Sequence, residues 1–207
     1  FKSKSLTSIM TKMINCKYRF GLTGTLDDTQ THKLVLEGLF GTANKIVSTK
    51  ELIDKKTLSN LKIDSLVLSY SDAECKLNKD LKYADELDFI VTHDKRLNFT
   101  KNLVSTINGN TLILFQFVEK HGLPLFNLIQ NELKDRKVFF VFGGVSAKER
   151  EDIRSITETQ KNAIIVASYG TFSTGINIKN LHNIIFSSPS KSKIRVLQSI
   201  GRGLRLG

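Results

Sequence analysis

The sequence is poor in cysteine and has no long apolar segment, and both absences narrow the possible classes of protein. It has only two cysteines, Cys16 and Cys75, which lie far apart and lack metal-ligand partners at any recognised spacing. We expect reduced thiols in a reducing compartment rather than a disulfide framework. No stretch approaches the run of about eighteen apolar residues that spans a membrane, so we expect no membrane partner.

The chain also lacks an initiator methionine, a signal peptide and a long basic tail. It begins Phe-Lys-Ser-Lys, and we therefore expect it to be part of a longer protein. Its 31 lysines and arginines outnumber 20 aspartates and glutamates, which gives a net charge of +11 spread along the chain. This excess predicts a polyanionic partner, nucleic acid first and an acidic membrane surface second. A basic surface that only contacts solvent stays an alternative.

Strands and helices alternate from residue 111 onward. The apolar strands are predicted at residues 111–115, 137–142, 162–167 and 183–186, and the helices at 118–134, after Ser146 and at 190–204. Strands this apolar are covered on both faces, which predicts an α/β fold with a parallel sheet. The loops after strands 111–115 and 162–167 then meet at the carboxyl edge, where such sheets bind ligands.

The first 110 residues are less regular. We predict helices at 5–14 and 29–39, strands at 18–22 and 61–69, and a short helix capped by Ser48 or Thr49. Residues 71–107 are predicted to be mostly helical, with a break after which Thr92 caps the second helix. Glycine after residue 40 should end the helix at 29–39. Residues 44–60 form the link between two lobes.

Two segments carry candidate chemistry. In the closing helix, Gln198, Arg202 and Arg205 share one face, and guanidinium groups suit phosphate oxygens. Gly201 and Gly203 allow close approach of a backbone or ligand, although a cationic helix end that meets its own dipole is the alternative. The loop 168–177 is dense in hydroxyls and glycine, which suit a phosphate site. Taken alone, this loop is more typical of an ordinary polar connection, and only its combination with other motifs favours the phosphate site.

The combination of these segments resembles motifs V and VI of superfamily-two helicases and translocases. Residues 21–26 (GLTGTL) resemble motif III, residues 112–117 motif IV, and Gly144 with Arg150 the element between motifs IV and V. Within the superfamily, residues 21–26, 38–41 and 167–186 most resemble a phage recombination and repair helicase. Asn177 stands where many relatives carry aspartate. Another branch of the superfamily also has asparagine at this position.

This resemblance implies two RecA-like lobes that clamp ATP. Residues 1–47 would be the end of lobe one, 48–60 the interlobe linker and 61–207 lobe two. The implied roles are arginine fingers (Arg202, Arg205), ATP binding (Gln198, Gly175, Asn177), nucleic-acid contact (Ser168, Thr171, Gln116, Phe117) and interlobe coupling (Thr23, Thr25). The implied partners are branched or single-stranded DNA and the first lobe of the same protein. The implied location is the cytoplasm, which is the cytoplasm of the host cell if a phage encodes the protein.

A motor of this kind needs a P-loop lysine and an acidic pair that binds Mg²⁺. The sequence contains no G-x-x-x-x-G-K-[ST], and we expect Asp85-Glu86 to lie on a solvated helix surface. We expect the P-loop and the Mg²⁺ ligands upstream of Phe1, so this chain alone should not hydrolyse ATP.

Two other functions stay open at this point. One is a basic nucleic-acid-binding module without ATPase activity, and the other a Rossmann-like transferase, which lacks the G-x-G-x-x-G after any strand. The four scattered histidines are expected at the surface or in turns, and Phe117 alone among the phenylalanines is a candidate for stacking on a base.

Overall fold

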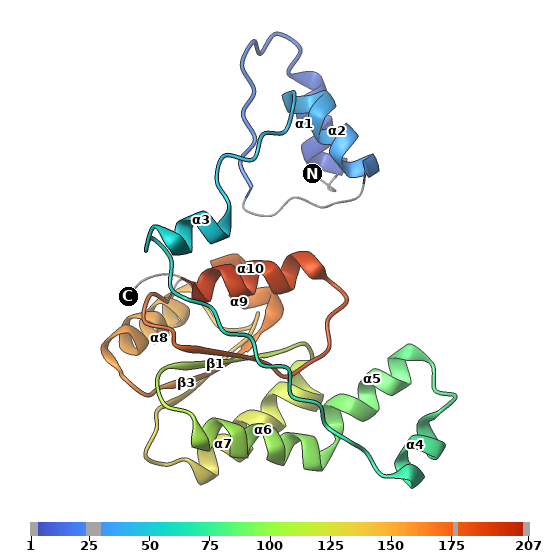
Figure 1. The fold of residues 1–207 in the computed structure, drawn as a ribbon, viewed down its shortest axis with the longest axis vertical. Coiled ribbons are helices and arrows are strands. Elements are labelled where there is room, and N and C mark those ends of the chain that lie inside the picture. Colours follow the sequence, from blue (N-terminus) through green and yellow to red (C-terminus); the bar gives the residue numbers. More distant parts are fainter. Residues whose placement is uncertain (1–3, 24–29, 176–177, 205–207) are drawn as a thin grey trace. The chain divides into compact units, whose positions relative to one another are not determined.

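The computed structural model describes residues 4–23, 30–175 and 178–204 (Figure 1). The chain divides into two compact units, Phe1–Lys56 and Thr57–Gly207, which we call unit one and unit two. The division falls inside the segment predicted as a linker, and the two units are described separately.

Unit one is helical in its described part. It contains α1 (Lys4–Lys12), α2 (Gln30–Phe40) and α3 (Thr49–Asp54). Gly41 ends α2 with a φ of +87°, a conformation that favours glycine, and its N–H donates to the carbonyl of Glu37. Ser48 caps α3 in a reciprocal capping box with Glu51. All three helices confirm the predictions.

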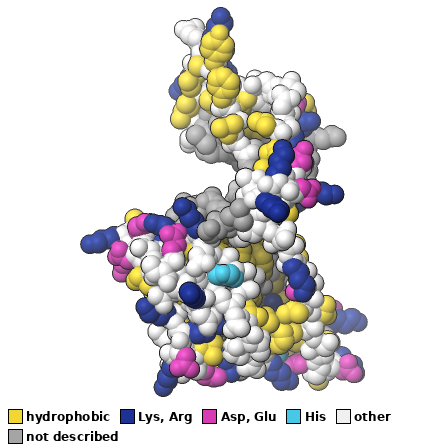
Figure 2. Space-filling model, turned by 60° about the vertical axis from the view of Figure 1, so that its left-hand side comes forward, with side chains coloured by type: hydrophobic (Ala, Val, Ile, Leu, Met, Phe, Trp, Pro, Cys, Tyr) yellow, Lys and Arg dark blue, Asp and Glu magenta, His cyan; other side chains and the backbone are white. Residues whose placement is uncertain are grey.

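The two strands predicted before residue 70 are wrong. Residues 18–22 and 61–69 are irregular, and Phe20, Leu22 and Val67 are each at least 85% exposed. Figure 2 shows hydrophobic side chains on the surface of unit one. Apolar residues alone do not make a strand, because the backbone must also find a neighbouring strand to pair with. No strand lies in the described part of unit one, and residues 61–69 do not join the sheet of unit two.

The sheet of unit two confirms the predicted parallel architecture. Its strands are β1 (Thr111–Phe115), β2 (Val138–Val141), β3 (Ile164–Ser168) and β4 (Asn183–Phe186). They lie in the order β2-β3-β1-β4, and every pair is parallel. Thr111 is opposite both Ile164 and Asn183, so three strands start at nearly the same level. Their carboxyl ends therefore meet along one edge.

Helices cover both faces of this sheet (Figure 1). The helices in the described part of unit two are α4 (Asp72–Asn78), α5 (Tyr83–Thr92), α6 (Asp94–Thr106), α7 (Leu123–Glu132), α8 (Ala147–Thr159), α9 (Tyr169–Gly175) and α10 (Lys193–Gly203). Residues of α6 and α7 pack with Ile113 and Phe115 on one face, and residues of α8 and α9 pack with Leu112 and Leu114 on the other. In the described ranges no helix is long and apolar enough to cross a membrane.

Some local details differ from the predictions. The break between α5 and α6 is where it was expected, but the residue that caps α6 is His93, since the Thr92 hydroxyl donates back to the Asp88 carbonyl. The helix expected from residue 118 opens with a π-helical turn, η1 (Val118–Gly122). At Gly122 a Cβ would lie 2.5 Å from the Phe115 ring, so this turn packs closely on β1. Asp85 and Glu86 are exposed, as expected.

Asn110 joins the amino ends of the strands. Its side-chain amide, which is fully buried, donates to the carbonyls of Thr157, Gln160 and Asn180 at 2.8–3.1 Å. Its side-chain oxygen accepts from the N–H of Ala163, just before β3. Its backbone bonds to His182, just before β4. One side chain therefore connects β1 to the segments that precede β3 and β4 and to the end of α8.

Arg136 reinforces the same edge. Its guanidinium donates to the carbonyls of Val104, Ile107, Gly109 and Asn162 at 2.7–3.1 Å. Burial lowers the pKa of this guanidinium. The amino edge is thus held by side chains that bond to backbone carbonyls, which leaves the carboxyl edge for function.

Replacement of Asn110 by alanine should destabilise unit two by about 2–4 kcal/mol, because several buried backbone groups lose their partners at once. The test is urea unfolding of the chain followed by circular dichroism. Asn102→Ala, at an exposed position of α6, is the matched control and should change stability by less than about 0.5 kcal/mol. Equal unfolding midpoints for the two variants would contradict the role given to Asn110.

Candidate nucleotide and nucleic-acid site

The carboxyl edge brings together residues that follow three different strands. Ser187, after β4, donates through its N–H and its hydroxyl to the carbonyl of Leu114 in β1. Ser188 accepts from the N–H of Gln116, which follows β1. These bonds hold the loops after β1 and β4 together, with Gln116 exposed and Ser188 buried.

Ser168 and Thr171 are paired at the end of β3. Their hydroxyl oxygens lie 2.8 Å apart, and the N–H of Thr171 donates to the Ser168 hydroxyl. Both residues are buried. The structure therefore brings these two predicted contact residues together, as a pair that caps the start of α9.

The loop after β1 is more open and more basic than the sequence suggested. Gln116 is exposed, and Phe117 is half-buried with the Lys120 ammonium 4.2 Å from its ring centroid. Lys120 also pairs with Asp88 of α5. Reasoning from the sequence missed Lys120, although its position three residues after Phe117 on a helical turn was a usable signal.

His121 is buried, and the expectation that it lies at the surface or in an exposed turn is wrong. The π-helical turn directs it inward, where its Nδ1 is 2.7 Å from the Ser188 hydroxyl oxygen. Burial, with a smaller contribution from the positive charge of Arg96, lowers the pKa of His121 to about 4. A neutral imidazole therefore supports the Ser188 loop at neutral pH.

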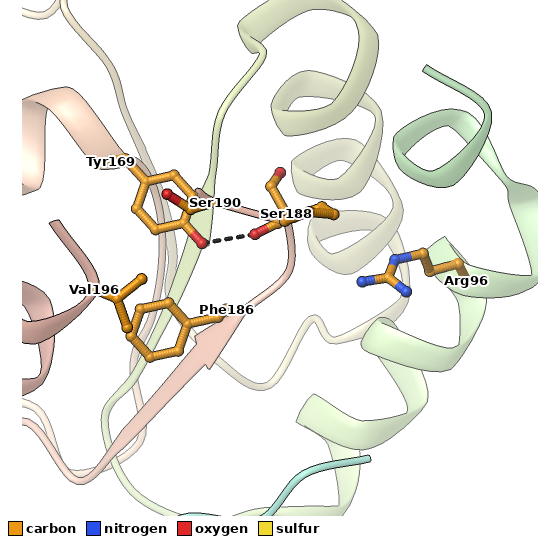
Figure 3. A pocket seen from close by; sticks show the side chains of 7 residues that line it. Arg96, Tyr169, Phe186, Ser188, Ser190 and Val196 are labelled. Carbon is orange, nitrogen blue, oxygen red and sulfur yellow. Dashed lines mark hydrogen bonds between the residues drawn. The ribbon is translucent and has the colours of Figure 1, made fainter. Parts of the chain in front are cut away.

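A pocket of about 290 Å³ opens beside this loop (Figure 3). Its lining residues are Arg96, Tyr169, Phe186, Ser188, Pro189, Ser190 and Val196. The Tyr169 hydroxyl donates to the Ser188 carbonyl at 2.8 Å, and Arg96 donates to the Ser187 carbonyl at 3.3 Å. Burial raises the pKa of Tyr169 to about 12, so its hydroxyl stays a donor. Arg96 and Tyr169 were not singled out in the sequence, because only the fold places them at this edge.

The closing helix α10 lies against α9 and β4. The Arg202 guanidinium carbon is 5.6 Å from the Phe172 ring centroid, and Gln198 is exposed. A Cβ on Gly203 would lie 2.6 Å from the Ile184 side chain, so α10 packs closely on β4 there. At Gly201 nothing lies within 4 Å of such a Cβ, so space is open at this position, and the approach of a backbone or ligand stays a prediction.

Several predicted site residues lie outside this picture. Thr25, Asn177 and Arg205 are beyond the described residues, and Gly175 is the last residue of α9. Thr23 belongs to unit one. Among the residues that the structure does describe, no group of histidine, cysteine, aspartate and glutamate could hold a metal ion. Figure 2 shows lysine and arginine side chains scattered over the visible face of unit two.

Comparison with known proteins places this chain, with its parallel sheet, hydroxyl-bearing strand ends and closing arginine helix, in one family. Residues 94–207 match the model of the helicase conserved C-terminal domain, and the chain belongs to that family. It is a superfamily-two helicase sequence, which confirms the resemblance read from its motifs.

Particular relatives agree with this assignment. The chain is 38% identical over 205 residues to the ATP-dependent DNA helicase UvsW of enterobacteria phage T4, covering 98% of this chain and 40% of the relative. The crystal structure of T4 UvsW superposes with a TM-score of 0.61 over 96% of this chain and 38% of that one. The chain thus spans about two fifths of the length of this relative.

The buried His121 should make the stability of unit two depend on pH. Its pKa is lower in the folded chain than the ordinary 6.5, so the unfolded chain binds the proton more tightly. Stability should be full above pH 7 and fall by roughly 2 kcal/mol between pH 7 and pH 5. Urea unfolding at both values measures this loss, which His121→Asn should largely remove. An unchanged pH dependence in that variant would contradict the assignment.

Proposed function

We propose that this chain supplies the second motor lobe of an ATP-dependent DNA helicase or translocase. The observation that carries the proposal is the 38% identity over 98% of the chain to a DNA helicase, in a fold whose carboxyl edge presents hydroxyls, amides and arginines. Residues 61–207 would form this lobe, with 1–47 as the end of lobe one and 48–60 as the linker. Thr23 and Thr25 would couple the two lobes.

ATP would bind at α10 and the end of α9. Arg202 and Arg205 would reach its γ-phosphate, and the fixed positive charge of such fingers accelerates hydrolysis by about 10³–10⁵. Gln198, Gly175 and Asn177 would position the nucleotide. Arg202 would meet the phosphate end of ATP, and the described residues of unit two offer no carboxylate cluster for Mg²⁺. Hydrolysis of the phosphoanhydride would supply the energy for movement.

DNA would run along the carboxyl edge. The exposed Gln116 and the half-buried Phe117 lie on one side, and Ser168 with Thr171 lies at the end of the adjacent strand. Hydroxyl and amide contacts to the sugar–phosphate backbone position a strand without reading its sequence. By analogy with the phage helicase, the substrate would be branched or single-stranded DNA in recombination and fork repair, handled in the cytoplasm of the cell.

A second candidate is a nucleic-acid-binding module without ATPase activity. It is favoured by one observation, the net charge of +11, which suits a polyanionic partner whether or not ATP is used. A P-loop and an Asp-Glu pair upstream of Phe1 in the longer protein would exclude it.

In the intact protein, Arg202→Ala and Arg205→Ala should each abolish DNA-stimulated ATP hydrolysis, with a loss of at least about 10³-fold. DNA affinity should stay within about threefold, because neither arginine contacts DNA in this proposal. Phosphate release and fluorescence anisotropy of labelled DNA measure the two properties. Near-normal turnover in both variants would overturn the assignment of the fingers.

Gln116→Glu should weaken DNA binding about tenfold at moderate salt, because a carboxylate of the same shape repels the phosphate backbone. Gln130→Glu is the matched control, since Gln130 is exposed near the end of α7 and the substitution changes the net charge equally. Anisotropy titrations with single-stranded DNA compare them. Equal affinities for the two variants would place the DNA elsewhere.

A further inference from the structure

Two pairs of residues with different chemistry lie where β3 leads into α9. Ser168 and Thr171 are three residues apart and bond to each other through their hydroxyls. Tyr169 and Phe172 are also three residues apart, and each is only 1% exposed within the core between the sheet and α10. Ser168 is the last residue of β3 and Thr171 lies in the first turn of α9, so the hydroxyl pair connects the strand to the helix, whereas both rings belong to α9.

Each buried ring faces an arginine of α10. The Arg195 guanidinium carbon lies 6.0 Å from the Tyr169 ring centroid, and that of Arg202 lies 5.6 Å from the Phe172 centroid. The two arginines are seven residues apart, which is two helical turns, and so they project from the same side of α10. A guanidinium at this distance is attracted to the face of an aromatic ring.

The ring restricts a side chain that would otherwise have many conformations. A long arginine side chain loses about 1.5–2 kcal/mol of rotamer freedom when it is fixed on a phosphate. A guanidinium already held against a ring has lost part of that freedom before the reaction, which is how positioning accelerates a chemical step. Gly203 keeps α10 close to β4, so the backbone that carries Arg202 is held as well.

We infer that Phe172 is a positioning residue for Arg202. The Phe172 ring holds the Arg202 guanidinium ready for the γ-phosphate. The inference rests on the proposed ATPase function. Thr171, one member of the hydroxyl pair predicted to touch DNA, lies on the same helix directly before Phe172, so α9 joins the two sites through adjacent residues.

The first test is Phe172→Leu in the intact protein, which removes the ring and keeps an apolar side chain. At saturating ATP and DNA, kcat should fall about fivefold to tenfold, as expected for loss of a partly desolvated cation–π contact. The KM for ATP and the affinity for DNA should stay within about twofold. Phe126→Leu is the control, because its ring stacks on Phe140 at 5.1 Å in the other core cluster, and its kcat should hardly change.

A double-mutant cycle separates positioning from general loosening of the core. In an Arg202→Lys background, Phe172→Leu should reduce kcat by less than about twofold, because the planar guanidinium is already gone. An equal reduction in both backgrounds, or an unchanged kcat in the single variant, would overturn the inference. Rates are compared per folded molecule, and Phe172→Met serves as a milder second variant expected to shift kcat in the same direction.

The outcomes also distinguish this inference from the function on which it rests. Loss of turnover in Arg202→Ala with normal turnover in Phe172→Leu would overturn only the role of Phe172. Full turnover in Arg202→Ala would overturn the finger assignment itself.

Discussion

The hydrogen bonds of the buried Asn110 amide are the constraint on which the rest of unit two depends. They fix the start of β1 relative to the segments that lead into β3 and β4 and to the end of α8. A buried amide that lost these partners would be costly, so alternative registers are disfavoured. Because the strands are parallel and in register, fixing their amino ends also fixes where their carboxyl ends emerge.

The candidate site follows from that geometry. Gln116, Ser168 and Ser188 come from three strand ends and lie along one edge because those ends lie level; Gln116 is exposed and both serines are buried. The bonds from Tyr169 and His121 to the Ser188 loop also anchor the first turn of α9. The helix with the arginines packs on α9, which carries Thr171 and Gly175, so one predicted DNA contact and one predicted ATP contact share that helix.

Much of this fold could be predicted because its signals are local. Uniformly apolar runs gave β1 and β4 with correct bounds. Ser48, one of two cap candidates, and Ser146 marked helix starts correctly. Residues 18–22 and 61–69 were mistaken for strands because pairing with a neighbour is not written in one segment. Burial of His121 and the place of Arg96 were missed for the same reason, since both depend on which loops meet in space.

The central claim is that this chain contributes arginines to an ATP site and does not contain that site whole. The most direct measurement is phosphate release from ATP, with and without single-stranded DNA, by the 207-residue chain and by the longer protein that we expect to include it and to carry a P-loop. The account predicts DNA-stimulated hydrolysis by the longer protein and none above background by the chain alone. Hydrolysis by the chain alone at the rate of the longer protein would contradict it.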